Sequence, residues 1–289
     1  LIFVAGNFKK INNTDAPYYE MIKTTGAIDY AYEQGIGASN SVRTIEKFGN
    51  QYFIGGDFSY YNGTPVHRMA RINQDGSLDP TFHTGTGFNN TVKDIAFQAD
   101  NKIVVVGDFT SYNGVQVDKI VRLNQNGQID PTFTTNFGVP MVLRTVTTYF
   151  DTVFVGGTFY INELNGATVR YYNLARLKMN GQVDTTFHLD QEIGNFVGYY
   201  DIQAMKDSSK LMLAGNGSKG MTRIFTNGDK DNTFQANGFF HDSIPSFIML
   251  PDGKYLCGTT YSYNGVASIS LSRLNHDGSI DQTLQTGSG

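Results

Sequence analysis

The residues most capable of chemistry in this 289-residue chain are an Arg and an Asp that return together at a fixed spacing. Arg71 precedes Asp79 by eight residues. The same spacing holds for Arg122 and Asp130, Arg176 and Asp184, Arg223 and Asp231, and Arg273 and Asp281. A guanidinium beside a carboxylate could relay charge, but a catalytic site is normally singular. Because this pair recurs, we interpret it as a structural link between a strand and a turn, using the five donors of Arg.

The segment that ends in this Asp also suggests a calcium loop. Residues 73–79 read Asn-Gln-Asp-Gly-Ser-Leu-Asp, with oxygen ligands at alternate positions before a Gly. An EF-hand needs an acidic residue at position twelve, where this chain has Thr84. We therefore favour an Asx-type turn whose side chain accepts backbone hydrogen bonds, and keep calcium as the alternative.

Other catalytic patterns are missing from the sequence. No pair of its five His has metal-ligand spacing, and no Ser lies in a Gly-x-Ser-x-Gly elbow. Cys257, the single cysteine, lies in an apolar segment and is predicted to be a core residue. The loose acidic candidates for a catalytic site are Glu163, Asp190, Glu192 and Asp242. We predict a chain that is not an enzyme, with no catalytic residues, no metal and no cofactor.

Tyrosines offer a different kind of site. Five of them lie outside the repeated positions: Tyr160, Tyr171, Tyr172, Tyr199 and Tyr200. Exposed aromatic faces with polar neighbours suit stacking against sugars or contact with a protein. We predict that these tyrosines form a binding surface for a protein or glycan partner, with ordinary packing inside the fold as the alternative.

Composition narrows the classes of partner. The formal net charge is −4 and only 17% of residues are charged, so no basic stripe is available to neutralise phosphates. Apolar runs such as residues 103–106 are strand-sized and far shorter than a membrane span. We expect neither nucleic-acid binding nor membrane insertion.

The Arg, the Asp and the turn between them belong to a sequence repeat that runs through the chain. The string Gly-x-x-Asp begins at Gly26, Gly76, Gly127, Gly181, Gly228 and Gly278, at intervals of 47 to 54 residues. One clear copy predicts strands over 91–98, 103–110 and 118–124, with a short fourth segment that ends at Phe133. Within it, Asn113-Gly114 predicts a type I′ hairpin turn. Four antiparallel strands in about 50 residues make one propeller blade. We therefore predict an all-β, six-bladed β-propeller of four-stranded repeats, a single domain over 1–289, with an open β-solenoid as the alternative.

The fullest copies carry a resemblance to a known family. Residues 54–63 read Ile-Gly-Gly-Asp-Phe-Ser-Tyr-Tyr-Asn-Gly, and residues 122–133 read Arg-Leu-Asn-Gln-Asn-Gly-Gln-Ile-Asp-Pro-Thr-Phe. This closely resembles the delta-60 repeat, a β-propeller repeat of large bacterial secreted and surface proteins and of some phage tail-associated proteins. The resemblance implies an extracellular, non-catalytic recognition or scaffold module and carries no catalytic residues. The alternatives are a propeller enzyme acting on glycans, as lyase or hydrolase, and a cytoplasmic interaction propeller of the WD40 or kelch kind.

The copies are not identical, and the ends fall within one repeat. The fourth copy is longer than the others between Phe159 and Arg176, and such loop differences are where a partner would be recognised. The first-strand segment appears five times and the Gly-x-x-Asp turn six times. We expect both termini on one blade, with the absent strand supplied by a flanking segment of a longer polypeptide.

Overall fold

The structure is a computed structural model that describes most of the chain as two compact units, residues 1–135 and 136–289. The described residues are 2–11, 13–16, 18–23, 27–30, 35–137, 141–164, 167–190, 193, 198–205, 208–216, 220–236, 244–258 and 271–284; side chains are described for these except 162–164 and 167–170.

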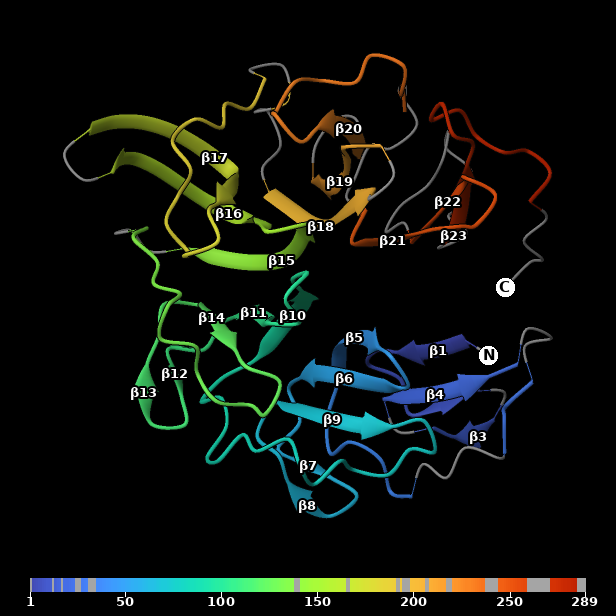
Figure 1. The fold of residues 1–289 in the computed structure, drawn as a ribbon. Helices are drawn as coiled ribbons and strands as arrows, with labels where there is room; N and C mark the ends of the chain where they lie inside the picture. Colours follow the sequence, from blue (N-terminus) through green and yellow to red (C-terminus); the bar gives the residue numbers. More distant parts are fainter. Residues whose placement is uncertain are drawn as a thin grey trace. The chain divides into compact units, whose positions relative to one another are not determined.

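The first unit consists of antiparallel sheets and short two-stranded ribbons (Figure 1). Its three-stranded sheets are β5 (Val42–Phe48), β6 (Gln51–Gly56) and β9 (Met69–Asn73), and β10 (Val92–Phe97), β11 (Ile103–Gly107) and β14 (Ile120–Leu123). Its two-stranded sheets are β1 (Ile2–Ala5) with β4 (Tyr19–Ile22), β2 (Lys10–Ile11) with β3 (Thr14–Asp15), β7 (Tyr60–Tyr61) with β8 (Thr64–Pro65), and β12 (Ser111–Tyr112) with β13 (Val115–Gln116).

The second unit contains three sheets of three antiparallel strands. They are β15 (Val142–Tyr149), β16 (Thr152–Leu164) and β17 (Ala167–Leu177); β18 (Gly198–Met205), β19 (Lys210–Asn216) and β20 (Met221–Phe225); and β21 (Ser246–Met249), β22 (Tyr255–Gly258) and β23 (Leu271–Leu274). The predicted all-β fold is confirmed, and the five first-strand segments counted in the sequence correspond to β5, β10, β15, β18 and β21. Among the described residues, no helix could cross a membrane.

The predicted fourth strand of each repeat is wrong in extent. In the described part of the chain, the segment after each turn forms one isolated antiparallel bridge with the third strand, such as Leu123 with Ile129. The bridge recurs in all six copies. Pairing ends there because the side chain of the following Asp bonds the backbone N–H two residues on, as Asp130 Oδ1 does with Thr132 N at 3.0 Å. The chain turns instead of continuing the ladder.

The hairpins between second and third strands follow the predicted turn chemistry in two repeats. Asn113 and Gly114 have φ values of 47° and 76°, and their neighbours Tyr112 and Val115 pair across the turn. Positive φ at both central residues is what a type I′ turn requires, so this prediction is confirmed. The fourth repeat departs from the pattern: β16 and β17 continue as one long curved hairpin with bulges (Figure 1).

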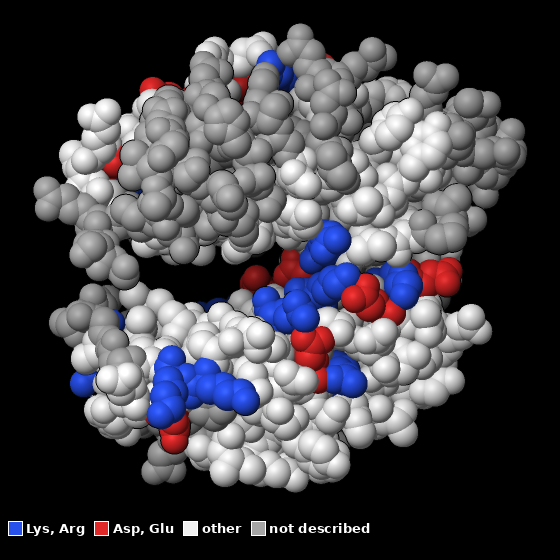
Figure 2. Space-filling model, turned by 180° about the vertical axis from the view of Figure 1, so that it is seen from behind, with Lys and Arg blue, Asp and Glu red and all other residues white. Residues whose placement is uncertain are grey.

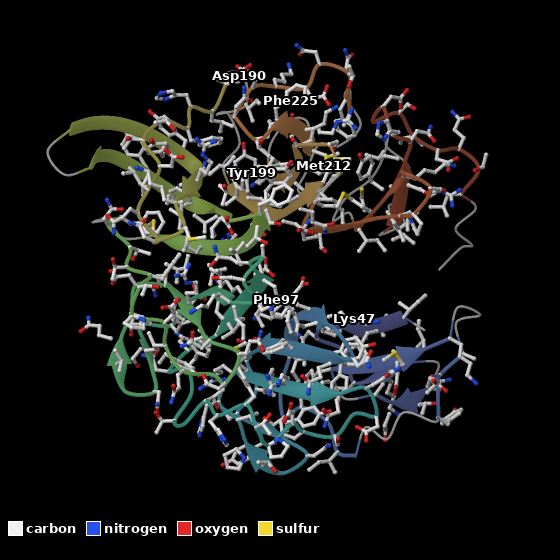
Figure 3. All side chains as sticks on the ribbon, viewed as in Figure 1. Lys47, Phe97, Asp190, Tyr199, Met212 and Phe225 are labelled. Carbon is white, nitrogen blue, oxygen red and sulfur yellow. The ribbon has the colours of Figure 1, made fainter. Side chains whose placement is uncertain are left out.

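Within each unit, the core lies between sheets of successive repeats. All residues of β11 are buried, as two-sided apolar strands require. In the first unit Phe53 of β6 packs edge-on against Phe97 of β10, with ring centroids 5.0 Å apart. In the second unit, Figure 3 places Tyr199 and Met212 among the strands of the β18–β20 sheet, where both are fully buried. Burying one such side chain stabilises the fold by about 1.5–3 kcal/mol.

Candidate functional site

The Arg and Asp of the second to sixth repeats form ion pairs, and the pair of the third repeat is fully buried. Arg122, on β14, donates from Nε to Asp130 Oδ2 at 2.8 Å, and both residues are less than 5% exposed. The other carboxylate oxygen accepts the Thr132 hydroxyl at 2.7 Å. Lys102 of β11 adds a second cation, 3.0 Å from Oδ2. The cluster thus joins a strand to the turn that follows it.

The same pair is built in the other four repeats that carry the Arg, so the structural interpretation is confirmed. The Nε–Oδ2 distances are 2.9 Å for Arg71–Asp79, 2.9 Å for Arg176–Asp184, 2.6 Å for Arg223–Asp231 and 2.6 Å for Arg273–Asp281. Burial opposes ionisation of Asp79, but hydrogen bonds from Thr81 and Gln51 and the charge of Arg71 outweigh it and lower its pKa to about 2. A carboxylate held ionised in this way is a poor general base at neutral pH.

Most of these guanidinium groups make further contacts. In the second to fifth repeats the face of the guanidinium covers the Phe that ends the repeat, with 4.9 Å between Arg122 Cζ and the Phe133 ring centroid. Where the next repeat lies in the same unit, Nη1 donates to a turn carbonyl of that repeat. These bonds are Arg71 to Gln125 at 2.7 Å, Arg176 to Thr226 at 3.0 Å and Arg223 to His276 at 2.9 Å. The Arg therefore bridges successive repeats.

The Gly-x-x-Asp turns satisfy their own polar groups. Asp75 Oδ1 accepts the backbone N–H and the hydroxyl of Ser77 at 2.9 and 2.7 Å, which confirms the Asx-type turn. Gly127 adopts φ 86°, and a Cβ there would lie 2.5 Å from the His83 carbonyl oxygen of the preceding repeat. Only glycine fits both the conformation and the space. The described residues contain no cluster of three or more His, Cys, Asp or Glu arranged for a metal.

Two of the five predicted site tyrosines form an exposed pair. Tyr160 and Tyr172 face each other across β16 and β17, are 41% and 42% exposed, and have ring centroids 4.7 Å apart at an interplanar angle of 32°. They lie on the long hairpin that sets the fourth repeat apart. The two rings therefore form an exposed aromatic pair on this hairpin.

Two others are not exposed, and the prediction that they share an exposed surface is wrong. Tyr171 is 4% exposed and donates its hydroxyl to the Asp184 carbonyl at 3.1 Å. Tyr199 is fully buried and donates to the Ile193 carbonyl at 3.2 Å. Each is followed along its strand by another tyrosine, and successive side chains point to opposite faces. One member of each pair must therefore point inward.

The fifth tyrosine, Tyr200, is half-buried beneath an arginine that the sequence analysis did not select. The Arg144 guanidinium lies over its ring at 4.9 Å from the centroid. The signal for this arginine lies in the strand pairing: when the first strands are aligned by their register shifts, Arg43 and Lys93 occupy the equivalent position.

The remaining candidates divide between the core and the surface. Cys257 is fully buried, with Sγ 3.3 Å from Met221 Sδ, and burial raises its pKa to about 12; it is a core residue as predicted. The Asp190 backbone N–H donates to the Gly228 carbonyl at 3.1 Å. The Glu163 side chain, Glu192 and Asp242 lie outside the described residues. On the face drawn in Figure 2, described basic side chains lie beside acidic ones.

The repeated antiparallel sheets, and the cluster that links them, define a β-propeller repeat protein. The family model described as "Domain of unknown function (DUF5122) beta-propeller" matches four segments, residues 50–82, 98–133, 151–187 and 250–284. These segments contain the Arg–Asp pairs of the second, third, fourth and sixth copies.

Solved structures share the fold at low sequence identity. A protein of unknown function from Bacteroides caccae superposes with a TM-score of 0.56 at 12% identity, over 96% of this chain and 90% of that one. The structure of U3-55K gives a TM-score of 0.53 at 10% identity, over 83% of this chain and 62% of that one. A comparison with curated proteins found no match.

Proposed function

We propose that this chain is a non-catalytic recognition module, a closed six-bladed β-propeller that binds a protein or glycan partner through the hairpin of its fourth repeat. The observation that carries the proposal is the exposed Tyr160–Tyr172 pair, on the long, bulged hairpin that β16 and β17 form in the fourth repeat. Elsewhere in the described chain, the recurring Asp side chains are occupied by their own repeat, as Asp130 is by Arg122 and Thr132.

The six copies of the turn and its bridge support the proposal of six blades. The resemblance to delta-60 repeats supports placement outside the cell, on a bacterial surface, in a secreted protein or in a virion, with flanking domains in the same polypeptide.

The test is a binding screen with the full chain. Wild-type protein, the double variant Tyr160→Ala with Tyr172→Ala, and the control Tyr60→Ala are each presented to a displayed peptide library and a glycan array. Tyr60 is 50% exposed but lies on a regular two-residue ribbon, so its variant matches the loss of an exposed ring without touching the long hairpin. We expect ligands retained by wild type and Tyr60→Ala to be lost by the double variant. Ligands that survive in a folded double variant would refute the proposed surface.

A further inference from the structure

Three first strands carry a cation at one equivalent position. In β5, β10 and β15 the pairing with the second strand shifts register by one residue, between Val42 and Thr44 in the first case. The residue at the shift is Arg43 in β5, Lys93 in β10 and Arg144 in β15. In β18 the same place is taken by Tyr200. The bulge therefore places one side chain, which differs between repeats, at the same point of each sheet.

In the first unit a carboxylate from the same repeat neutralises this cation. Arg43 Nη2 lies 2.7 Å from Asp57 Oδ2, and Lys93 Nζ lies 2.6 Å from Asp108 Oδ1. Asp57 and Asp108 each follow the glycine that ends the second strand. Sequence position therefore identifies the partner that each cation should have.

The fourth repeat keeps the cation and has no carboxylate at this place. The residue after Gly157 is Thr158, which pairs with Val142 beside Arg144. Within the part of the chain that the structure describes, Arg144 has neither an ion pair nor a hydrogen bond, and its Nε is buried without an acceptor. A buried donor left unsatisfied is unfavourable, so an acceptor brought from outside would be stabilised at this position.

The described residues around Arg144 contact the face of its guanidinium and not its N–H groups. Tyr200 covers one face of it, at 4.9 Å from the ring centroid. Stacking uses the face of a guanidinium and leaves its in-plane N–H fork free for a carboxylate. The acidic neighbour Asp201 is engaged elsewhere, because its Oδ2 accepts the Phe247 backbone N–H at 2.9 Å.

We propose that Arg144 and Tyr200 form a binding site for a carboxylate, supplied by an Asp or Glu side chain of a protein partner. The incoming carboxylate would take the role that Asp57 and Asp108 have in the earlier repeats. A protein source is favoured because Arg and Tyr are the residues enriched at protein interfaces, and Val142, 39% exposed, adds an apolar contact on the same strand. The choice of a protein partner rests on the proposed recognition function, whereas the carboxylate site is tested without any partner.

The test uses the full chain labelled with ¹⁵N and a blocked tripeptide, acetyl-Gly-Asp-Gly-amide. We expect the Arg144 Nε–Hε signal to shift saturably with this peptide and not with its Asn counterpart. Arg144→Gln should weaken the binding at least tenfold. Arg43→Gln, which removes an internally paired cation at the equivalent position, should leave the binding unchanged.

A second variant keeps Arg144 but gives it a carboxylate partner within the chain. Thr158→Asp restores the internal carboxylate of the earlier repeats and should reduce peptide binding at least tenfold, while the neutral Thr158→Asn should not. Saturable binding that persists in Thr158→Asp, or no saturable binding in wild type, would overturn the site. Binding of digalacturonate without binding of the Asp peptide would overturn the protein partner. Neither outcome depends on Tyr160 and Tyr172, so the site and the proposed hairpin surface fail separately.

Discussion

Replacing Asp130 with Asn tests the ion-pair cluster most directly. The carboxylate accepts four donors, from Arg122 Nε, Lys102 Nζ and both the N–H and hydroxyl of Thr132, at 2.7 to 3.0 Å. The amide of the Asp130→Asn variant would keep one acceptor oxygen and turn its N–H₂ group toward other donors. Because the Arg122 side chain is only 4% exposed, its charge would remain buried without a counter-ion. Breaking a buried pair in this way costs about 3–5 kcal/mol, which is the loss we expect in the free energy of unfolding.

The measurement is urea unfolding at pH 7, followed by far-UV circular dichroism and tyrosine fluorescence, since the chain contains no Trp. Asp281→Asn is the matched control. It removes the same carboxylate from the last repeat, where the Arg273 and Lys254 side chains are 23% and 30% exposed and water can solvate them. Its loss should be clearly smaller. Equal losses for the two variants, or a loss below about 1 kcal/mol for Asp130→Asn, would refute the argument from burial.

Three further outcomes are expected. Phe133→Ala, which removes a ring 8% exposed beneath Arg122, should cost about 3–5 kcal/mol, and a melting temperature within a degree or two of wild type would contradict the core assignment. Chelator should leave the melting temperature unchanged because the Asp75 turn satisfies itself; a drop of several degrees that calcium restores would favour the calcium alternative. The pKa of Asp79 is about 2 in the folded chain against about 3.9 unfolded, so its ionised form stabilises the fold above about pH 5 and this contribution is lost as the pH falls toward 2. At pH 7 the free energy of unfolding of wild type should exceed that of Asp79→Asn by about 2–3 kcal/mol. Urea unfolding repeated between about pH 5 and pH 2 should show this difference becoming smaller, and a difference that stays constant would rule out the linkage.

The sequence predicted those features that repetition makes visible. A pair such as Arg122 and Asp130 returns at constant spacing, so its structural role could be inferred before any geometry was known. The fourth strand was overestimated because the side-chain bond that ends it, from Thr132 to Asp130, competes with the ladder and leaves no trace in strand propensity.

Site prediction failed where strand alternation was not applied. Tyr171 and Tyr172 are neighbours on β17, so the burial of the first follows once the second is exposed. Arg144 was missed for a different reason: its equivalence to Arg43 depends on a register shift that only the paired strands reveal. The absent carboxylate at Thr158 becomes informative only after that alignment.

The bond from each bridging Arg to the following repeat has a consequence for how such chains can evolve. The acceptor is a main-chain carbonyl, and the residues that supply it in the two units are as different as Gln125, Thr226 and His276. Because this hydrogen bond involves only a backbone carbonyl of the following repeat, it tolerates any side chain at the acceptor position. A duplicated copy of the repeat would bring its own arginine and its own carbonyl, and could be inserted beside any other copy. Turn sequences can then diverge while the hydrogen bond between neighbouring repeats is kept.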